Sequence, residues 1–570
     1  MQTMPTDDAL VRVPLKRRRI VIFADGTGNA FSQQESNVWR MYRALERGPG
    51  PDGAEQIARY IPGVGTASNP VIRAIDGATG FGVPSNVRKL YRFLCWNWRE
   101  GDEIHMIGFS RGAFTLRTLA GMIRFQGLMP RDWPADGQGG EYLPEGYRGR
   151  PVTEAEMKRN VLAAWNGYRR QTAPFLKDGW PQMAPWIALI RALRDGIGMV
   201  WRSLRGQPQH QAVRDCLPPP RRPPPDSGPA AGDHIRIDSL GLFDTVEAYG
   251  VPVNGLREAF SRTFWPITFR NRVCSKVVKE ADHLLSLDDE RLTFHPIRFD
   301  QSGAGTADAP TIIRELWFAG MHSDVGGGYP EDSAAMEPLL WMVQAAEARG
   351  LRFDAGLIHG HARQRSPQAV IHDSRSGLGM AYRYQPRRKR EGPAHGGTQV
   401  LHGSVIRKMD HGFDGYAPLL LPKAVQVNEG PKDWGQFTAM PLERQQAAAE
   451  RVDRLIRWRR RNNRMQIGVA VAFVALPMLV LLWPGGAAPD WAELCRWAGA
   501  WFGVLGLKLE PLWQLYRPLW AFALPLLAVE AGLYDWSRRQ AWAIRDGARR
   551  VWQPPAPGGV AGVQPGGGGG

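Results

Sequence analysis

A short buried strand followed at once by a serine and a helix is the feature that most constrains this chain. Residues 104–109 are mostly apolar and run into the pentapeptide GFSRG at 108–112, after which apolar residues recur at helical spacing. A serine on so sharp a turn is lifted clear of the sheet edge, and the turn requires small residues two positions before and after it. Gly108 and Gly112 meet this requirement. The pattern predicts that Ser110 is a nucleophile on a strand–turn–helix elbow.

Strand and helix patterns alternate on both sides of this elbow. The apolar runs at 19–24, 56–61, 234–243 and 313–320 are typical of buried strands, and the periodicity at 37–47, 87–98 and 333–349 predicts helices. Buried strands alternating with helices favour a mostly parallel sheet with helices on its faces. We therefore predict an α/β fold in which 313–320 is the last strand.

Composition divides the chain into a core and several additions. The core is predicted in two halves, at 16–130 and 233–440, preceded by a disordered leader at 1–15. The intervening 131–232 is predicted to be an inserted cap or lid, with an amphipathic helix at 186–204 and a proline-rich segment at 217–229. An ordinary core helix is the alternative for 186–204. A helical region at 441–550 and a disordered Gly-rich tail at 551–570 complete the chain.

An acid and a histidine follow the serine in the order that this kind of fold uses for a Ser-His-Asp triad. Asp244 comes directly after the strand at 234–243, and His322 lies in a Gly-rich loop after the strand at 313–320. We predict that His322 takes the proton of Ser110 and that Asp244 orients the imidazole.

Three further residues stay open as alternatives. His283 and His402 also follow the serine in the chain and compete with His322 for the role of base. Asp324 competes for the role of acid, although its place two residues after the histidine is better suited to holding that loop.

Backbone N–H groups that stabilise an oxyanion are predicted at two places. The N–H of Arg111 follows the serine on the elbow, and the loop DGTGN at 25–29 offers a second near Gly26 or Thr27. A plain tight turn is the alternative for that loop. It lacks GxGxxG, which excludes a dinucleotide fingerprint. The predicted chemistry needs neither a metal nor a cofactor.

Charge and cysteine content narrow the class of protein. The net charge is +17, and basic residues cluster at 16–19, 387–390 and 454–464 without any zinc spacing or nucleic-acid recognition motif, so we do not expect nucleic acid as a partner. The 4 cysteines form no CxxC pair, which argues against a disulfide framework or structural zinc. No apolar signal segment occurs in 1–15, so we expect synthesis in the cytoplasm.

The C-terminal region predicts membrane association. A basic helix at 443–464 precedes an uncharged apolar run at 467–483, and a second apolar run lies at 519–534. The first run is at the short end of the length that spans a bilayer, and arginines flank both runs on one side, as the positive-inside rule requires of a helical hairpin. A packed helical bundle is the alternative.

Five motifs together resemble a known family. DGTGN at 25–29, GFSRGA at 108–113, FDTV at 243–246, HSDVGGGY at 322–329 and HGSV at 402–405 occur in this order. They resemble the α/β-hydrolase domain family of largely uncharacterised proteins that includes phospholipase effectors of type VI secretion. The resemblance covers about residues 17–425. Members commonly have Trp in the first loop, where this chain has Gly28.

The resemblance implies an α/β-hydrolase fold, a Ser-Asp-His triad and hydrolysis of phospholipid acyl esters. It further implies a phospholipid membrane as partner, delivery into a target cell by a dedicated secretion system, a secretion spike and an immunity protein as partners, and in some members a C-terminal membrane anchor. The alternatives are a soluble carboxylesterase of non-lipid acyl esters and a non-catalytic membrane-anchored scaffold.

Overall fold

The computed structural model describes 18–26, 35–63, 82–132, 150–172, 235–247, 273–301, 311–375, 382–387, 399–411, 415–419, 421, 424–441, 445–482 and 520–552. Several predicted features lie outside these residues, namely the leader, Thr27, the lid helix at 186–204, the proline-rich segment at 217–229 and most of the Gly-rich tail.

The described strands form one 10-stranded sheet in the order β10-β9-β8-β7-β6-β5-β4-β1-β3-β2. They are β1 (Arg18–Ala24), β2 (Gly48–Pro49), β3 (Glu55–Ile61), β4 (Glu103–Phe109), β5 (Ile237–Phe243), β6 (Val278–Ser286), β7 (Ile312–Phe318), β8 (Val400–His402), β9 (Ala424–Asn428) and β10 (Thr438–Pro441). The pairs from β3 through β1 and on to β9 are parallel, and the edge strands β2 and β10 pair antiparallel. The predicted mostly parallel α/β sheet is confirmed.

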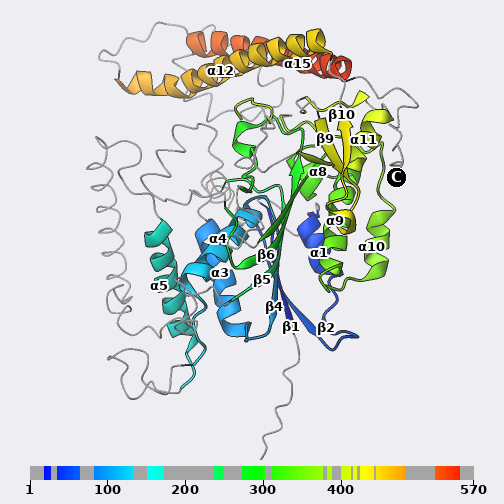
Figure 1. Cartoon of the computed structure of the whole chain (residues 1–570). Helices are drawn as coiled ribbons and strands as arrows, with labels where there is room; N and C mark the ends of the chain where they lie inside the picture. Colours follow the sequence, from blue (N-terminus) through cyan, green and yellow to red (C-terminus); the bar gives the residue numbers. More distant parts are fainter. Residues whose placement is uncertain are drawn as a thin grey trace, which may run out of the picture.

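Helices cover both faces of this sheet (Figure 1). On one face lie α3 (Gly82–Asn97), α4 (Ser110–Gln126) and α5 (Glu154–Thr172), and on the other lie α1 (Asn37–Ala44), α9 (Met336–Glu347) and α10 (Ala355–Ala362). The short helices α8 (His322–Gly326) and α11 (Gly403–Asp410) follow β7 and β8.

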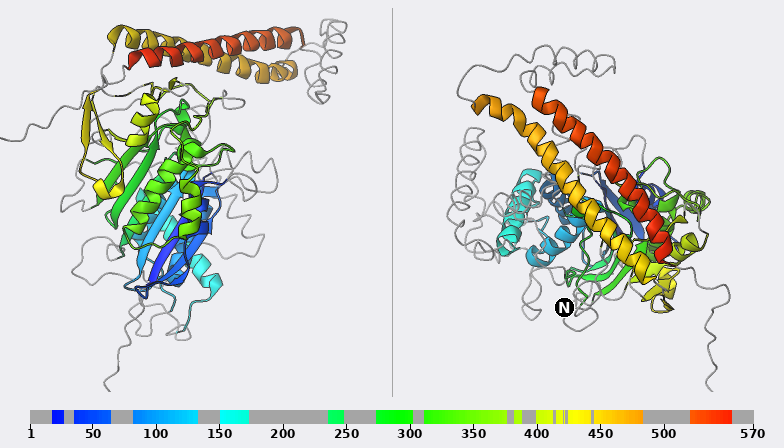
Figure 2. Two further views of the ribbon diagram at one scale, coloured as in Figure 1. Left: turned by 90° about the vertical axis from the view of Figure 1, so that its right-hand side faces the viewer. Right: turned by 90° about the horizontal axis from the view of Figure 1, so that it is seen from above.

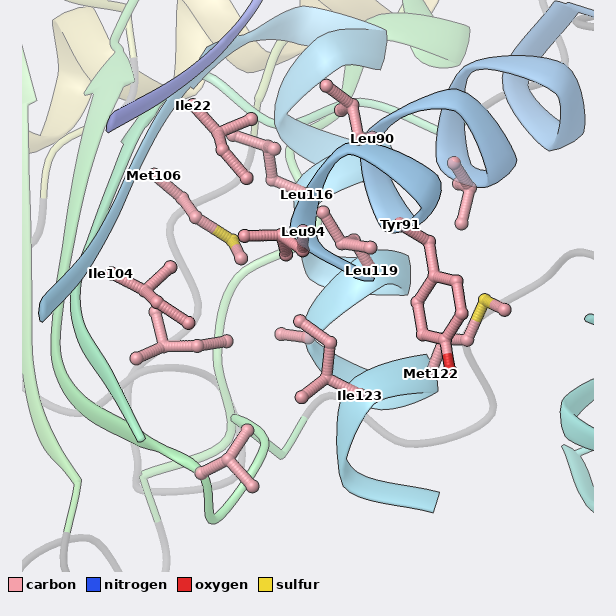
Figure 3. Packing of buried hydrophobic residues seen from close by; sticks show 14 of the residues in the cluster. Ile22, Leu90, Tyr91, Leu94, Ile104, Met106, Leu116, Leu119, Met122 and Ile123 are labelled. Atoms are coloured by element: carbon pink, nitrogen blue, oxygen red, sulfur yellow. The ribbon is translucent and has the colours of Figure 1, made fainter. Parts of the chain in front are cut away.

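The larger core lies between the sheet and the helices α3, α4 and α5. Figure 3 shows Leu90 and Leu94 of α3 packed with Leu116 of α4 and with Ile104 and Met106 of β4. Each of these side chains is fully buried, and burying each one stabilises the folded chain by about 1.5–3 kcal/mol. Helix α5, which lies within the predicted insertion at 131–232, also belongs to this core. A second cluster packs α1 and α9 on the opposite face.

Two strand predictions differ from the structure. The strand at 313–320 was expected to be the last, which is wrong because β8, β9 and β10 follow it. Strand β6 was not predicted, because buried polar residues interrupt its apolar pattern. Asp282 and His283 are both fully buried, and Arg314 of β7 and Arg349 pair with Asp282 while Glu315 pairs with His283.

The two C-terminal helices lie side by side across the end of the sheet where α8 begins (Figures 1 and 2). Helix α12 (Gln446–Leu482) joins the predicted basic helix and apolar run in one element, and α15 (Trp520–Val551) extends well past the predicted second run. Their inner side packs on the sheet through Val452, Ile456 and Ile544, which contact a cluster from β6, β7 and β8. None of the described helices combines the length and the hydropathy that crossing a bilayer requires.

Candidate active site

The strand–turn–helix elbow is present, and Ser110 stands at its apex. Strand β4 ends at Phe109 and α4 begins at Ser110, whose φ of 57° lies in the left-handed region that side chains rarely adopt. A Cβ on Gly108 would lie 2.8 Å from Leu116 Cδ1, and one on Gly112 would lie 2.1 Å from the carbonyl oxygen of Ala24. The glycines are therefore needed because the elbow packs against α4 and the end of β1.

Three side chains from three elements are joined by two short hydrogen bonds. His322 Nε2 lies 2.7 Å from Ser110 Oγ, and His322 Nδ1 lies 2.6 Å from Asp244 Oδ2. Ser110 and Asp244 directly follow the parallel strands β4 and β5, and His322 lies four residues after the end of β7. The exposed fractions of Ser110, His322 and Asp244 are only 4%, 4% and 0%. With its proton on Nδ1, the imidazole donates to Asp244 and accepts from the serine hydroxyl. This is the arrangement of a serine nucleophile with its general base.

Burial and charge set the protonation of the histidine and the acid. Burial lowers the pKa of His322, although the hydrogen bond and charge of Asp244 act to raise it. Burial would raise the pKa of Asp244, but the charge of Arg387 and the hydrogen bond from His322 hold it well below its usual value. At neutral pH the imidazole is neutral and the carboxylate is ionised, which is what a general base and its orienting acid require.

Arg387 is a part of the site that the sequence analysis did not single out. Its guanidinium forms a fork on Asp244, with Nη1 2.7 Å from Oδ1 and Nη2 2.7 Å from Oδ2. In the sequence it is the first residue of the basic cluster at 387–390. Nothing in the run of basic residues at 387–390 distinguishes Arg387 from the others, so no sequence signal identifies it.

The candidate oxyanion loop packs directly against the elbow. A Cβ built on Gly26 would lie 3.2 Å from Ser110 Cβ, and Arg111 lies in the first turn of α4. The N–H of Gly26 donates to Asp25 Oδ1 at 2.6 Å. To hold an oxyanion, this N–H must turn away from that carboxylate. Thr27 lies outside the described residues.

Asp25 anchors the start of this loop. It is buried, and its Oδ2 accepts hydrogen bonds from Ser36 Oγ at 2.6 Å and from the Tyr60 hydroxyl at 2.7 Å. Burial and the charge of Asp25 raise the pKa of Tyr60, so the phenol stays protonated and keeps donating. The loop is thereby tied to the N-cap of α1 and to β3.

The two alternative histidines lie elsewhere. His283 is fully buried, with Nδ1 2.9 Å from Glu315 Oε1, and its Nε2 accepts the N–H of Thr245. His402 caps α11, where its side chain accepts the N–H of Ser404, and burial lowers its pKa to about 4. The structure brings neither histidine to the serine and instead gives both of them structural partners.

Asp324, the alternative acid, pairs with a different histidine. Its Oδ1 lies 2.6 Å from Nδ1 of His372, and its Oδ2 accepts the N–H of Met321. His322, expected in a loop, in fact opens the five-residue helix α8, and Asp324 caps that helix. The acid therefore holds the element that carries His322 and does not touch the imidazole itself.

Aromatic side chains enclose the histidine. The ring of Phe109 lies 4.7 Å and that of Phe294 lies 5.1 Å from the ring of His322, and Phe294 in turn contacts Tyr382. This lining limits the access of water to the imidazole. Within the described ranges, no group of three His, Cys, Asp or Glu side chains is placed to hold a metal ion.

A family model and two individual proteins are similar to this chain. The family model described as "T6SS, Phospholipase effector Tle1-like, catalytic domain" matches residues 18–345. An uncharacterised protein of Saccharomyces cerevisiae is 24% identical over 428 residues, which cover 60% of this chain and 59% of the yeast protein. A crystal structure of an uncharacterised protein from Pseudomonas aeruginosa aligns at 19% identity and a TM-score of 0.28, covering 62% of this chain and 50% of that one. The chain thus spans between half and three fifths of these two proteins.

Proposed function

This chain belongs to the family of Tle1-like catalytic domains of type VI secretion phospholipase effectors, and from that premise we propose that it hydrolyses acyl esters of phospholipids by a serine mechanism. The observation that carries the proposal is the hydrogen-bonded chain from Ser110 through His322 to Asp244 on a strained elbow. A serine hydroxyl alone is a weak nucleophile, and it becomes reactive when an adjacent neutral imidazole accepts its proton.

In this mechanism Ser110 Oγ attacks the acyl carbonyl while His322 Nε2 takes its proton. Asp244 stabilises the imidazolium that forms, and His322 then returns the proton to the leaving lysophospholipid alcohol. Water, activated by the same histidine, attacks the acyl-enzyme and releases the fatty acid. The protein's own side chains suffice for each proton transfer.

The developing oxyanion would be held by the N–H of Arg111 and by an N–H of the loop at Gly26 and Thr27. Each such donor is worth about 3 kcal/mol of transition-state stabilisation. In this structure the N–H of Gly26 donates to Asp25 Oδ1 at 2.6 Å, so it would have to turn toward the substrate to act as one of these donors.

The helical pair of α12 and α15 is the proposed membrane contact. Its surface exposes large apolar side chains, among them Trp458, Met465, Val471 and Trp542, whose exposed fractions are 55%, 48%, 58% and 67%. Arginines of 454–464 lie on the same helix, which suits an anionic phospholipid surface. Because the family consists of type VI secretion effectors, the proposal includes delivery by a secretion apparatus, with a spike and an immunity protein as partners.

Phospholipid vesicles test the proposal directly. We expect the wild-type chain to release fatty acid from vesicles of phosphatidylethanolamine and phosphatidylglycerol, and Ser110→Ala to lose at least about 10³-fold of that activity. Ser366→Ala, outside the site, is the matched control and should retain full activity. Equal activity of wild type and Ser110→Ala would exclude the serine mechanism. Hydrolysis of p-nitrophenyl butyrate without any hydrolysis of vesicles would make the chain an esterase of soluble substrates.

A further inference from the structure

Arg387 pairs with the acid that also bonds His322. Its side chain is buried, with 2% of the residue exposed, and it bonds both oxygens of Asp244 at 2.7 Å. The same guanidinium donates to the carbonyl oxygens of Ser286 and Phe294, which lie on either side of the loop after β6. These four hydrogen bonds fix the orientation of the Arg387 guanidinium, and the guanidinium in turn fixes the orientation of the Asp244 carboxylate.

The carboxylate of Asp244 is shared among three residues. Its Oδ2 accepts from both His322 Nδ1, at 2.6 Å, and Arg387 Nη2, while Oδ1 accepts from Arg387 Nη1 and the N–H of Ser286. The backbone at Asp244 has a φ of 42°, in the left-handed region, so the residue needs strong partners to stay there. A planar, permanently charged fork suits this task better than a lysine, which offers a point charge.

The segment that carries Arg387 is fastened to the C-terminal helices. The N–H of Tyr384 donates to Asn463 Oδ1 of α12 at 2.7 Å, and the guanidinium of Arg459 lies 4.3 Å from the centre of the Tyr384 ring. Arg459 also pairs with Glu290 at 2.9 Å, and the carbonyl oxygen of Glu290 accepts the N–H of Gln385. Tyr384, Asn463, Arg459 and Glu290 are buried. Helix α12 therefore supports the segment that carries Arg387.

We propose that Arg387 is a positioning residue for the Asp244–His322 pair, and that α12 holds it in place through Tyr384 and Asn463. This inference rests on the proposed function, because it takes the serine, histidine and acid to perform the chemistry. In this proposal, α12 supports the active site through Arg387, in addition to its proposed role as a membrane contact.

The charge of Arg387 has a consequence that a purely structural residue would not have. His322 faces the acids Asp244 and Asp289 and the cation of Arg291, and Arg387 stands behind Asp244. Because Arg387 neutralises part of the charge on Asp244, it weakens the stabilisation of the imidazolium. Removing this cation favours protonated His322, so activity is then lost at a higher pH.

The test measures kcat and KM against pH with p-nitrophenyl butyrate, for wild type, Arg387→Gln, Arg387→Lys, Asn463→Ala and Ser110→Ala. Arg387→Gln is expected to lower kcat by more than about 10-fold, and by less than the about 10⁴-fold that loss of the acid's role costs. KM should change less than kcat, and the acidic limb of the plot of kcat against pH should move to higher pH. Arg387→Lys should return this acidic limb to its wild-type position but recover only part of kcat. Asn463→Ala should also lower kcat, by a smaller factor than Arg387→Gln.

Arg407→Gln is the matched control, since it removes an exposed arginine that pairs with Glu429 away from this segment. It should leave kcat and the pH profile unchanged. Circular dichroism and thermal unfolding check that each variant is folded, and if Arg387→Gln does not fold, Arg387→Lys and Asn463→Ala decide the question. Wild-type kcat in every folded Arg387 variant, or a lowered kcat with an unmoved acidic limb, would overturn the role of Arg387. Full activity in Ser110→Ala would instead overturn the proposed function, and this inference with it.

Discussion

The glycine two residues after Ser110 offers the sharpest test of how the elbow is built. Gly112 lies inside α4, where alanine is ordinarily better than glycine by about 1 kcal/mol. Here, however, a Cβ would lie 2.1 Å from the carbonyl oxygen of Ala24 and 2.5 Å from that of Asp25. Both atoms are backbone, so no side chain can rotate away, and the end of β1 must move.

The expected magnitude follows from these two opposing effects. Overpacking in a close-packed interior costs about 1–3 kcal/mol, and a backbone collision on this scale belongs at the upper end. After the helical gain of about 1 kcal/mol is subtracted, Gly112→Ala should lower the free energy of unfolding by about 2 kcal/mol. A displaced Asp25 also moves the candidate oxyanion N–H of Gly26, and a misplacement of about 1 Å costs about 100-fold in rate.

Urea unfolding followed by tryptophan fluorescence, together with kcat/KM on p-nitrophenyl butyrate, measures both effects. Gly360→Ala in α10 is the matched control, because a Cβ there meets nothing within 4 Å and should stabilise the helix by about 1 kcal/mol. If Gly112→Ala behaved like Gly360→Ala and kept full activity, the packing argument for the elbow would be refuted.

Three further predictions follow from the same structure. Because burial lowers the pKa of His322, kcat/KM on a soluble ester should stay level down to about pH 6.5 and fall only below it, and a midpoint above that pH would contradict a buried neutral base. The pKa of His402 is about 4 in the folded chain and higher in the unfolded chain, so the unfolded chain binds the extra proton and the free energy of unfolding drops as pH falls from about 6.5 to 4. In urea unfolding, wild type should lose about 3 kcal/mol more than His402→Gln over that range. Equal losses would show that His402 is not buried in its neutral form. Replacing Trp458 and Trp542 together by serine should weaken binding to anionic vesicles by at least about 10-fold in a sedimentation assay. Val370 is exposed outside α12 and α15, and Val370→Ser should have no effect. Unchanged binding of the double variant would exclude α12 and α15 as the membrane contact.

The elbow and the sheet around it were predictable because their signals are local. Strands β1, β4 and β5 are short apolar runs that end in turn residues, and α4 follows β4 without a gap. The hydrophobic periodicity and the turn residues are therefore enough to identify these elements. Strand β6 escaped detection because its buried Asp282 and His283 are neutralised by partners from β7 and from Arg349. A pattern of hydrophobicity cannot register a polar residue whose partner is distant in sequence.

The sequence predicted Ser110, His322 and Asp244 as the candidate triad, but it left His283 and His402 open as alternatives to His322. His283, His322 and His402 all follow Ser110 in the chain, and each lies within a strand or a few residues after one. Chain order is compatible with each of them, whereas a hydrogen bond requires one imidazole to lie within about 3 Å of the serine.

By itself the sequence determined the fold class, the elbow with its two glycines, and the residue types of the site, since these depend on the period of a strand or helix and on steric limits within a few residues. Only the tertiary structure decided that His322 contacts both Ser110 and Asp244, that Arg387 forks onto the acid, and that Asn463 of α12 supports the segment between them. The physical reason is that the energy of these contacts depends on distances across 78 to 212 residues of chain. Such distances are set by how the strands are ordered in the sheet, and no local pattern encodes that order.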